Sequence, residues 1–193
     1  LKTALVETKD KEGRLPSVYI DNIEATYEAT KHLLDKGIKN IAFIGVDKSS
    51  ANAWGDRYIG YEKALNEAGI SVDEDLVYFE GLKVKSGYVA SEKFLASGKN
   101  FDGIICASDE IAMGAINGLR EKGVNTPEDV SVIGFNDNVV ASYFYPKLTT
   151  VKQPSYDMGS VAMRMLIKIL NNKPLEEAEF ILNHELIERE SCK

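Results

Sequence analysis

Two short polar turns each follow an apolar run, and their side chains could bind a small polar molecule. Ser108-Asp109 follows Ile104–Ala107, and Asn136-Asp137-Asn138 comes just after Val130–Ile133. Continuous apolar runs of this length are typical of strands covered on both faces in a parallel sheet. Ligands of open parallel sheets bind beyond the carboxyl ends of the strands, where hydroxyl, carboxylate and amide groups can hydrogen-bond to them. We therefore predict a binding site at these two turns.

Both turns also have an explanation that needs no ligand. Asp109 stands where a strand passes into a helix, so its carboxylate could cap the helix by accepting bonds from first-turn N–H groups. Asn and Asp are also common turn formers, which accounts equally well for residues 136–138. A cap or turn at the mouth of a crevice can still contact a ligand, so the alternatives are compatible.

A second group of candidates lies near the start of the helix expected after the polar loop 47–55. Arg57 follows Asp56, the expected cap, and a cation there meets the positive end of the helix dipole. Such a cation usually has an anionic or polyol partner, although a solvated surface arginine is the alternative. Trp54, the only tryptophan, could stack on a sugar ring or anchor local packing.

The motifs of common enzymes are absent from the sequence. It has no glycine-rich phosphate-binding loop and no G-x-S-x-G turn, and its two histidines, His32 and His184, are not at metal-ligand spacing. Carboxylates are numerous, but none forms a recognisable acid/base pair. We predict no enzymatic activity, no cofactor and no metal.

Composition narrows the class of protein further. A formal net charge of −7 over 193 residues disfavours a nucleic-acid surface, so any contact with DNA must come from another segment. Cys106 and Cys192 fit neither a metal cluster nor a disulfide framework, which favours a reducing, cytoplasmic compartment. No run approaches the ~18 apolar residues of a membrane span. The chain begins with Leu1 rather than Met, which leaves open a preceding segment.

Strands and helices alternate over most of the chain, and this order predicts a parallel sheet with helices on both faces. The expected strands are Ser17–Ile20, Ile41–Val46, Leu76–Phe79, Ile104–Ala107, Val130–Ile133 and Leu148–Lys152. The expected helices are 24–36, 56–68, 84–96, one beginning near Asp109 and one from Pro154 to about 170. Two last strands, 180–182 and 185–188, must return to a sheet formed earlier. Gly114 and Gly118 lie one turn apart in a helix, which predicts close packing on a neighbouring element.

Two stretches carry a resemblance to a known family, namely ASDEIAMGAINGLREKGVNTPEDVSVIGFND and YPKLTTVKQPSYDMGSVAMRML. They resemble the effector-binding core of LacI/GalR-family transcription regulators, and the likeness extends from SVYIDN to HELIERES. It implies a periplasmic-binding-protein-like α/β fold, in which two doubly wound parallel-sheet subdomains enclose a sugar, a sugar phosphate or a similar metabolite. It also implies a homodimeric repressor whose helix-turn-helix headpiece, absent from this chain, contacts operator DNA.

The resemblance assigns segments to the two subdomains. Residues 1–22 would end an incomplete N-subdomain, and 23–150 would form the effector-binding C-subdomain. Residues 151–175 would supply a crossover and an N-subdomain helix, and 176–193 would return to the C-subdomain. An extracytoplasmic sugar-binding protein of a transporter would share this fold, and only the preceding segment would distinguish it.

The resemblance also assigns roles to particular residues. Arg57, within DRYIGYEKAL, falls on the arginine that grips the effector, and Ser108 and Asp109 fall on the polar pair after a strand. Asn136 falls on a position that is often Asp in the family. The exchange keeps an acceptor, adds a donor and removes a charge, so a different effector preference is expected.

One helix resembles the catabolite-control branch of the family, in which it docks the phosphocarrier protein HPr phosphorylated on serine. The residues on the matching positions are Tyr156, Asp157, Val161 and Arg164. An ordinary core stripe, with Met158 and Met165 on the same helix as Val161, is the alternative.

Overall fold

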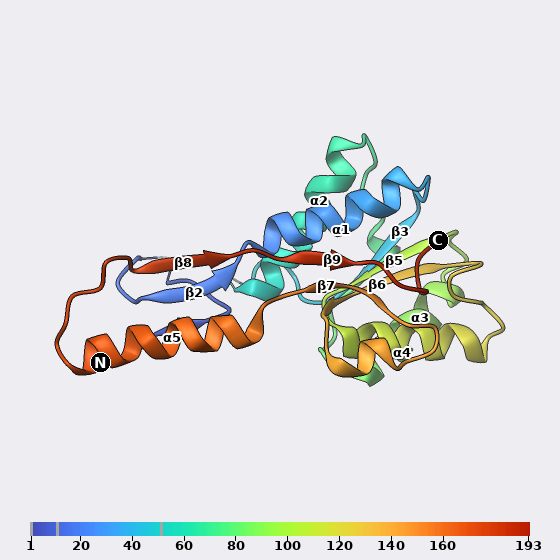
Figure 1. Ribbon diagram of the computed structural model, residues 1–193. Helices are drawn as coiled ribbons and strands as arrows, with labels where there is room; N and C mark the ends of the chain where they lie inside the picture. The colour runs from blue at the N-terminus through green and yellow to red at the C-terminus, as the bar shows by residue number, and fades with distance from the viewer. Residues whose placement is uncertain (1, 11, 51) are drawn as a thin grey trace. The chain divides into compact units, whose positions relative to one another are not determined.

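The computed structural model describes residues 2–10, 12–50 and 52–193, which form an α/β structure (Figure 1). The predicted terminal segment 1–22 and the predicted loop 47–55 each include residues outside the described ones. The chain divides into a larger unit, Asn22–Lys152 with Glu185–Lys193, and a smaller unit, Leu1–Asp21 with Gln153–His184. The backbone therefore passes from one unit to the other three times.

The larger unit is built on a six-stranded sheet in the order β4-β3-β5-β6-β7-β9. The strands are β3 (Ile41–Ile44), β4 (Val77–Tyr78), β5 (Gly103–Cys106), β6 (Ser131–Asn136), β7 (Thr149–Lys152) and β9 (Glu185–Ile187). All neighbours pair in parallel except β9, which is antiparallel to β7. Every residue of β3 and β5 is buried, as the continuous apolar runs predict.

Two pairs of helices cover this sheet, one pair on each face (Figure 1). The pairs are α1 (Asn22–Asp35) with α2 (Ala53–Glu67), and α3 (Val84–Ala96) with α4 (Asp109–Glu121). A Cβ placed on Gly114 would lie 1.9 Å from the backbone oxygen of Val84, and one on Gly118 would lie 2.1 Å from Ser91 Oγ. The predicted close packing at these two glycines is confirmed. Two short 3₁₀ helices, η1 (Glu74–Leu76) and η2 (Val139–Ser142), complete this unit.

The smaller unit has a three-stranded parallel sheet in the order β1-β2-β8 and one helix. Its elements are β1 (Leu5–Val6), β2 (Ser17–Ile20), α5 (Ser155–Leu170) and β8 (Glu179–Leu182). Met158, Ala162 and Met165 of α5 pack with Val18 to form its core, and Phe180 and Leu182 lie against them. The apolar stripe of α5 thus has the structural role that its spacing predicts.

The end of the chain departs from the predicted subdomain assignment. β8 pairs with β2 in the smaller unit, and only β9 joins the larger sheet. The expectation that 176–193 returns as a whole to the C-subdomain is therefore wrong for β8. Two short strands separated by Asn183-His184 carry no local signal of the sheet that each will join. No helix among the described residues combines the length and the hydropathy needed to span a bilayer.

Candidate functional site

The two polar turns meet at the carboxyl-end edge of β5 and β6. The backbone N–H of Asn138 donates to Asp109 Oδ2 at 2.6 Å, so the turn after β6 contacts the start of α4 directly. Ser108 is buried and caps α4, because its Oγ accepts from the N–H of Ile111 at 3.3 Å. The alternative in which Asp109 caps the helix is wrong, because the cap lies one residue earlier.

Asp109 holds this edge together from inside the larger unit. Its side chain is fully buried, and Thr150 Oγ1 of β7 donates to its Oδ1 at 2.5 Å. Burial raises the pKa of Asp109 to about 6, although the bonds from Thr150 and Asn138 work in the opposite direction. Because both carboxylate oxygens accept bonds from the protein, Asp109 positions the turn, and a direct contact with a ligand would cost those bonds.

The backbone is unusual where β6 ends, at Asn136, the last residue of the strand, and at Asp137, the first of the turn. Asn136 and Asp137 have φ values of 110° and 55°, a region that residues with side chains seldom adopt. Asp137 Oδ1 lies 2.6 Å from Arg189 Nη2, and each of these side chains is 17% exposed. Arg189 also donates from Nη1 to the backbone oxygen of Leu148 at 2.8 Å. The C-terminal segment thus supports the turn through Asp137, in addition to the bond between Asp109 and Asn138.

Arg57 is buried beside the ends of the same two strands. Its Nη1 donates to the backbone oxygen of Ala107 at 2.6 Å, and its Nε donates to Asn22 Oδ1 at 2.9 Å. Its guanidinium carbon lies 3.7 Å from the centre of the Phe135 ring and 4.5 Å from that of Trp54. The alternative of a solvated surface arginine is wrong. Trp54 stacks on this cation, which supports the packing alternative for that residue.

The sequence misplaces the start of α2. Asn52 is the cap, and its Oδ1 accepts from the N–H groups of Trp54 and Gly55 at 3.0 and 3.2 Å. Asp56, the predicted cap, lies inside the helix, and Arg57 follows it. Arg57 therefore lies more than one turn from the N-terminus of the helix, where the effect of the helix dipole is weak. Its hydrogen bonds and aromatic contacts explain its position better than the dipole does.

Sequence reasoning missed several residues that shape these edges. Arg189 bonds to Asp137, and Thr150 bonds to Asp109, which in turn contacts Asn138, yet neither Thr150 nor Arg189 belongs to a recognisable motif. In the smaller unit, Glu7 follows β1 with φ 61°, and Gln153 Nε2 donates to its Oε1 at 2.5 Å. A polar residue directly after a strand was the available signal for Glu7, but the short β1 gave no clear apolar run.

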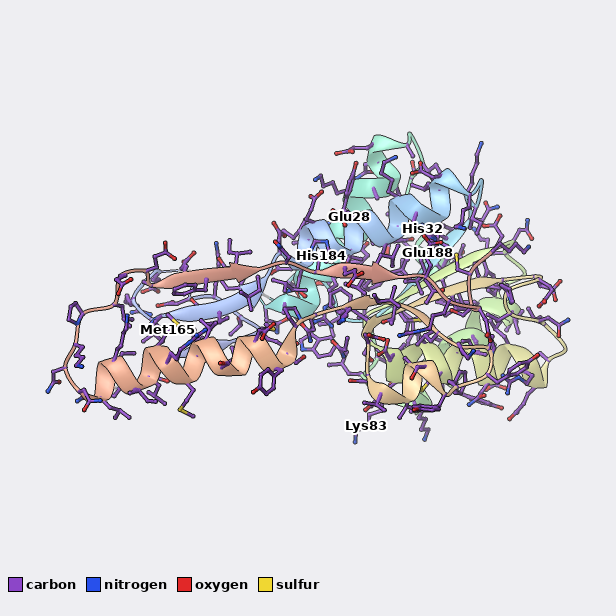
Figure 2. The ribbon with its side chains drawn as sticks, in the orientation of Figure 1. Glu28, His32, Lys83, Met165, His184 and Glu188 are labelled. Atoms are coloured by element: carbon purple, nitrogen blue, oxygen red, sulfur yellow. The ribbon has the colours of Figure 1, made fainter. Side chains whose placement is uncertain are left out.

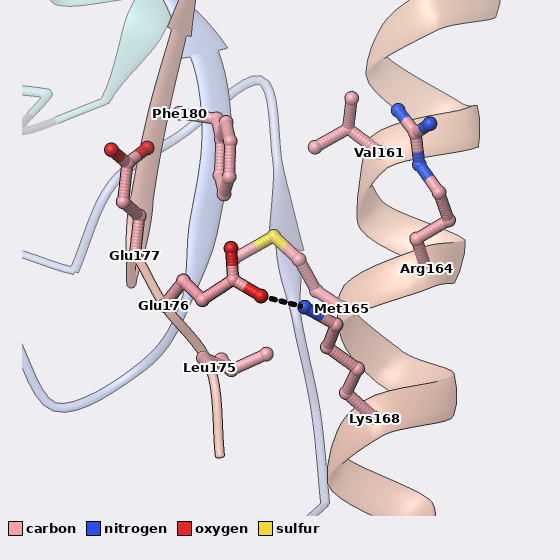
Figure 3. Close-up of a pocket in the computed structure, with 8 residues that line it drawn as sticks. All are labelled: Val161, Arg164, Met165, Lys168, Leu175, Glu176, Glu177 and Phe180. Atoms are coloured by element: carbon pink, nitrogen blue, oxygen red, sulfur yellow. Dashed lines mark hydrogen bonds and ion pairs between the residues drawn. The ribbon is translucent and has the colours of Figure 1, made fainter. Parts of the chain in front are cut away.

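The four residues predicted to dock a protein partner separate into two pairs on α5. Tyr156 and Asp157 are exposed near the start of the helix, Tyr156 to 88%. Val161 and Arg164 line a cavity of about 320 Å³ in the smaller unit (Figure 3). The remaining lining residues are Met165, Lys168, Leu175, Glu176, Glu177 and Phe180. The core-stripe alternative is right for Met158 and Met165, which are buried.

Comparison with known proteins identifies this architecture. Residues 30–192 match the periplasmic binding protein-like domain. The structure superposes with a TM-score of 0.91 on a LacI-type transcription regulator from Bifidobacterium animalis subsp. lactis, at 30% identity over 98% of this chain and 71% of that one. The chain belongs to the LacI family. The expected α/β, periplasmic-binding-protein-like fold is confirmed.

Two further relatives place this LacI-family core more closely. Transcription regulator CcpA of Lactococcus lactis matches with a TM-score of 0.90 and 37% identity, over 98% of this chain and 69% of that one. HTH-type transcriptional regulator RegA of Clostridium saccharobutylicum is 64% identical over 99% of this chain and 58% of its own length. The chain thus spans a little over half the length of this relative. Relatives of this kind are regulators rather than enzymes, which agrees with the missing catalytic motifs.

Proposed function

We propose that this LacI-family core senses a small polar effector, a sugar, sugar phosphate or similar metabolite, at the carboxyl-end edge of β5 and β6. The observation that carries the proposal is the position of Arg57, which contacts Ala107 after β5 and Phe135 of β6. This buried cation brings positive charge to the ends of two adjacent strands, beside the polar turns of Ser108 and Asn136, and would favour anionic or hydroxylated ligands there. Trp54 would complete the aromatic surroundings of this cation.

The effector would act by a difference in affinity between two states of the protein. A ligand shifts a conformational equilibrium only as far as it binds one state better than the other. In the whole regulator, a homodimeric repressor of the cytoplasm, this shift would control binding of a helix-turn-helix headpiece to operator DNA. The acidic composition of the chain agrees with DNA contacts made by another segment. The regulator relatives favour this role over that of a transporter's sugar-binding protein.

The effector site can be tested by a thermal-shift screen of sugars and sugar phosphates, followed by calorimetry on each ligand that raises the unfolding temperature. The variant Asn136→Gly removes the side chain, and glycine tolerates the φ of 110° without strain. We expect it to lower affinity at least tenfold, whereas Asn100→Gly, in an exposed loop before β5, should bind normally. Equal affinity of the Asn136→Gly variant and the wild type would exclude this site.

We also propose HPr phosphorylated on serine as a protein partner of α5. Arg164 is exposed and lines a cavity whose other lining residues include apolar side chains, and it has no hydrogen bond or ion pair within the described residues. An arginine with this freedom is suited to bidentate bonding of a phosphate, and the apolar lining offers contact area around it. Val161, Tyr156 and Asp157 would extend the contact along the helix.

The partner proposal calls for calorimetric titration with phosphorylated and unphosphorylated HPr. We expect binding of the phosphorylated form and a loss of at least tenfold in affinity for Arg164→Ala. Gly159→Ala, on an open part of the same helix, serves as the control, because a Cβ there meets no neighbouring atom within 4 Å. Equal binding of the two forms of HPr would contradict the proposal.

A further inference from the structure

One ion pair spans the cavity of the smaller unit. Lys168 Nζ of α5 lies 3.0 Å from Glu176 Oε1, on the segment between α5 and β8 (Figure 3). The side chains are 42% and 89% exposed. An ion pair this open to water strengthens an equilibrium by a factor of only about one and a half to five. Glu176 therefore holds Lys168 weakly enough for another anion to displace it.

The second cation of the cavity is not neutralised in this way. Arg164 lies one turn before Lys168 on α5, and Glu177 lies beside Glu176, yet neither forms an ion pair among the residues that the structure describes. In Figure 3, Lys168 points across the cavity toward Glu176, whereas Arg164 extends along α5 to the level of Val161, which faces Phe180. These side chains form a surface with two cations and an apolar neighbour. One acidic side chain of the protein already occupies part of that surface.

We infer that Glu176 competes with a partner for Lys168. A partner must therefore present an anionic group that binds Lys168 more strongly than the Glu176 carboxylate does. The inference rests on the proposed docking of a serine-phosphorylated protein at this cavity. A phosphate carries a charge of about −1.5 to −2 and three acceptor oxygens, so it can displace Glu176 from Lys168, and the exposed Arg164 side chain, one turn away on α5, can turn toward it. A carboxylate would only exchange one acid for another at Lys168, and an unmodified serine would leave Glu176 in place.

This competition gives the surface its selectivity. Any anion that binds Lys168 must first break the ion pair between Lys168 and Glu176. Only a group that bonds to Lys168 more strongly than a carboxylate does therefore binds with a net favourable free energy. Glu176 can withdraw because its carboxylate contacts no other donor among the described residues and lies outside any helix or strand. The result is a site that distinguishes phosphoserine from an acidic residue as well as from serine.

The test is calorimetric titration of the wild type and Glu176→Gln with three forms of HPr: phosphorylated on serine, unphosphorylated, and with that serine replaced by aspartate. We expect Glu176→Gln to bind the phosphorylated form about two- to fivefold more tightly. We also expect it to bind the aspartate form more tightly than the serine form, a distinction that the wild type lacks. Circular dichroism checks the fold, which an exposed side chain should not affect.

Glu177→Gln is the matched control, because it removes the same charge from the neighbouring residue of the same cavity. Glu176→Gln should also have no effect in a Lys168→Ala background. The inference would be overturned if both glutamine variants gained affinity for phosphorylated HPr equally, or if the wild type already bound the aspartate form more tightly than the serine form. Neither result would contradict the docking proposal. If neither the wild type nor Glu176→Gln binds phosphorylated HPr, the docking proposal is wrong. Binding that appears only in Glu176→Gln would support the competition, and its absence there too would overturn both.

Discussion

Thr150 donates its hydroxyl hydrogen to the buried carboxylate of Asp109, and this bond of 2.5 Å joins β7 to the first turn of α4. The same carboxylate accepts from the backbone of Asn138. One side chain thus connects the end of a strand, the start of a helix and the turn that we propose to contact an effector. Its protonation state should influence all three.

The first prediction concerns the pH dependence of stability. The pKa of Asp109 is about 6 in the folded protein and 3.8 in its ordinary state, so the folded protein holds this proton more tightly. Its contribution to the free energy of unfolding is therefore fully present below pH 3.8 and is lost as the pH rises through 6, by about 3 kcal/mol at most. In Asp109→Asn this loss should vanish, although the variant should be less stable at pH 7.

Urea unfolding between pH 4 and pH 7 measures this difference. The difference in unfolding free energy between the wild type and Asp109→Asn should grow at the acidic end of the range. A constant difference across the range would show that the pKa of Asp109 is not raised in the folded protein.

The second prediction concerns the support of the 136–138 turn. Asp137 and Arg189 form a half-buried ion pair, so we expect a coupling energy of roughly 1–3 kcal/mol in a double-mutant cycle of Asp137→Asn and Arg189→Gln. Urea unfolding of the two single variants and the double variant measures it. If the losses in unfolding free energy of the two single variants add up to that of the double variant, the Asp137–Arg189 pair makes no net contribution to stability.

The third prediction concerns the α3–α4 contact. Gly114→Ala would place a methyl group 1.9 Å from a backbone oxygen, which the close packing of the two helices cannot accommodate without movement. We expect a loss of at least about 1–3 kcal/mol in the free energy of unfolding. Gly159→Ala, in a helix with open space around it, should instead gain about 0.5–1 kcal/mol. Similar effects of the two alanines in chemical denaturation would refute the packing explanation.

The fourth prediction concerns the start of α2. Asn52→Ala removes the acceptor for two first-turn N–H groups and should cost about 1 kcal/mol. Removing the side chain of Asn100, an exposed loop residue, should change stability much less. Thermal unfolding of Asn52→Ala and Asn100→Ala compares them, and equal midpoints would show that the cap contributes nothing.

The sequence predicts this fold well where its pattern is local. The apolar runs locate β3, β5 and β6, and the glycines of α4 correctly indicate its close packing. The caps are less certain, since Asn52 and Asp56, or Ser108 and Asp109, satisfy the same local preference. Choosing between them requires knowing where the backbone turns, which neighbouring residues in space decide.

The candidate site is predictable only in part for the same reason. The rule about strand ends correctly places Asp109 beside Asn138. The partners Arg189 and Thr150 come from distant segments, and no spacing along the chain indicates that they meet Asp137 and Asp109. Sequence position also cannot show that Arg57 is enclosed by Phe135 and Trp54, because burial of a cation depends on tertiary contacts.

The pairing of β2 with β8 has a consequence for how the protein is made. Ser17 of β2 pairs with Glu179 of β8, so β2 can form this pairing only after β8 has been synthesised. During synthesis, the larger unit can gather most of its strands while the smaller unit still lacks both α5 and β8. A chain cut short before α5 would therefore contain most of the larger unit but would lack the α5 and β8 side chains that pack against Val18 in the smaller one.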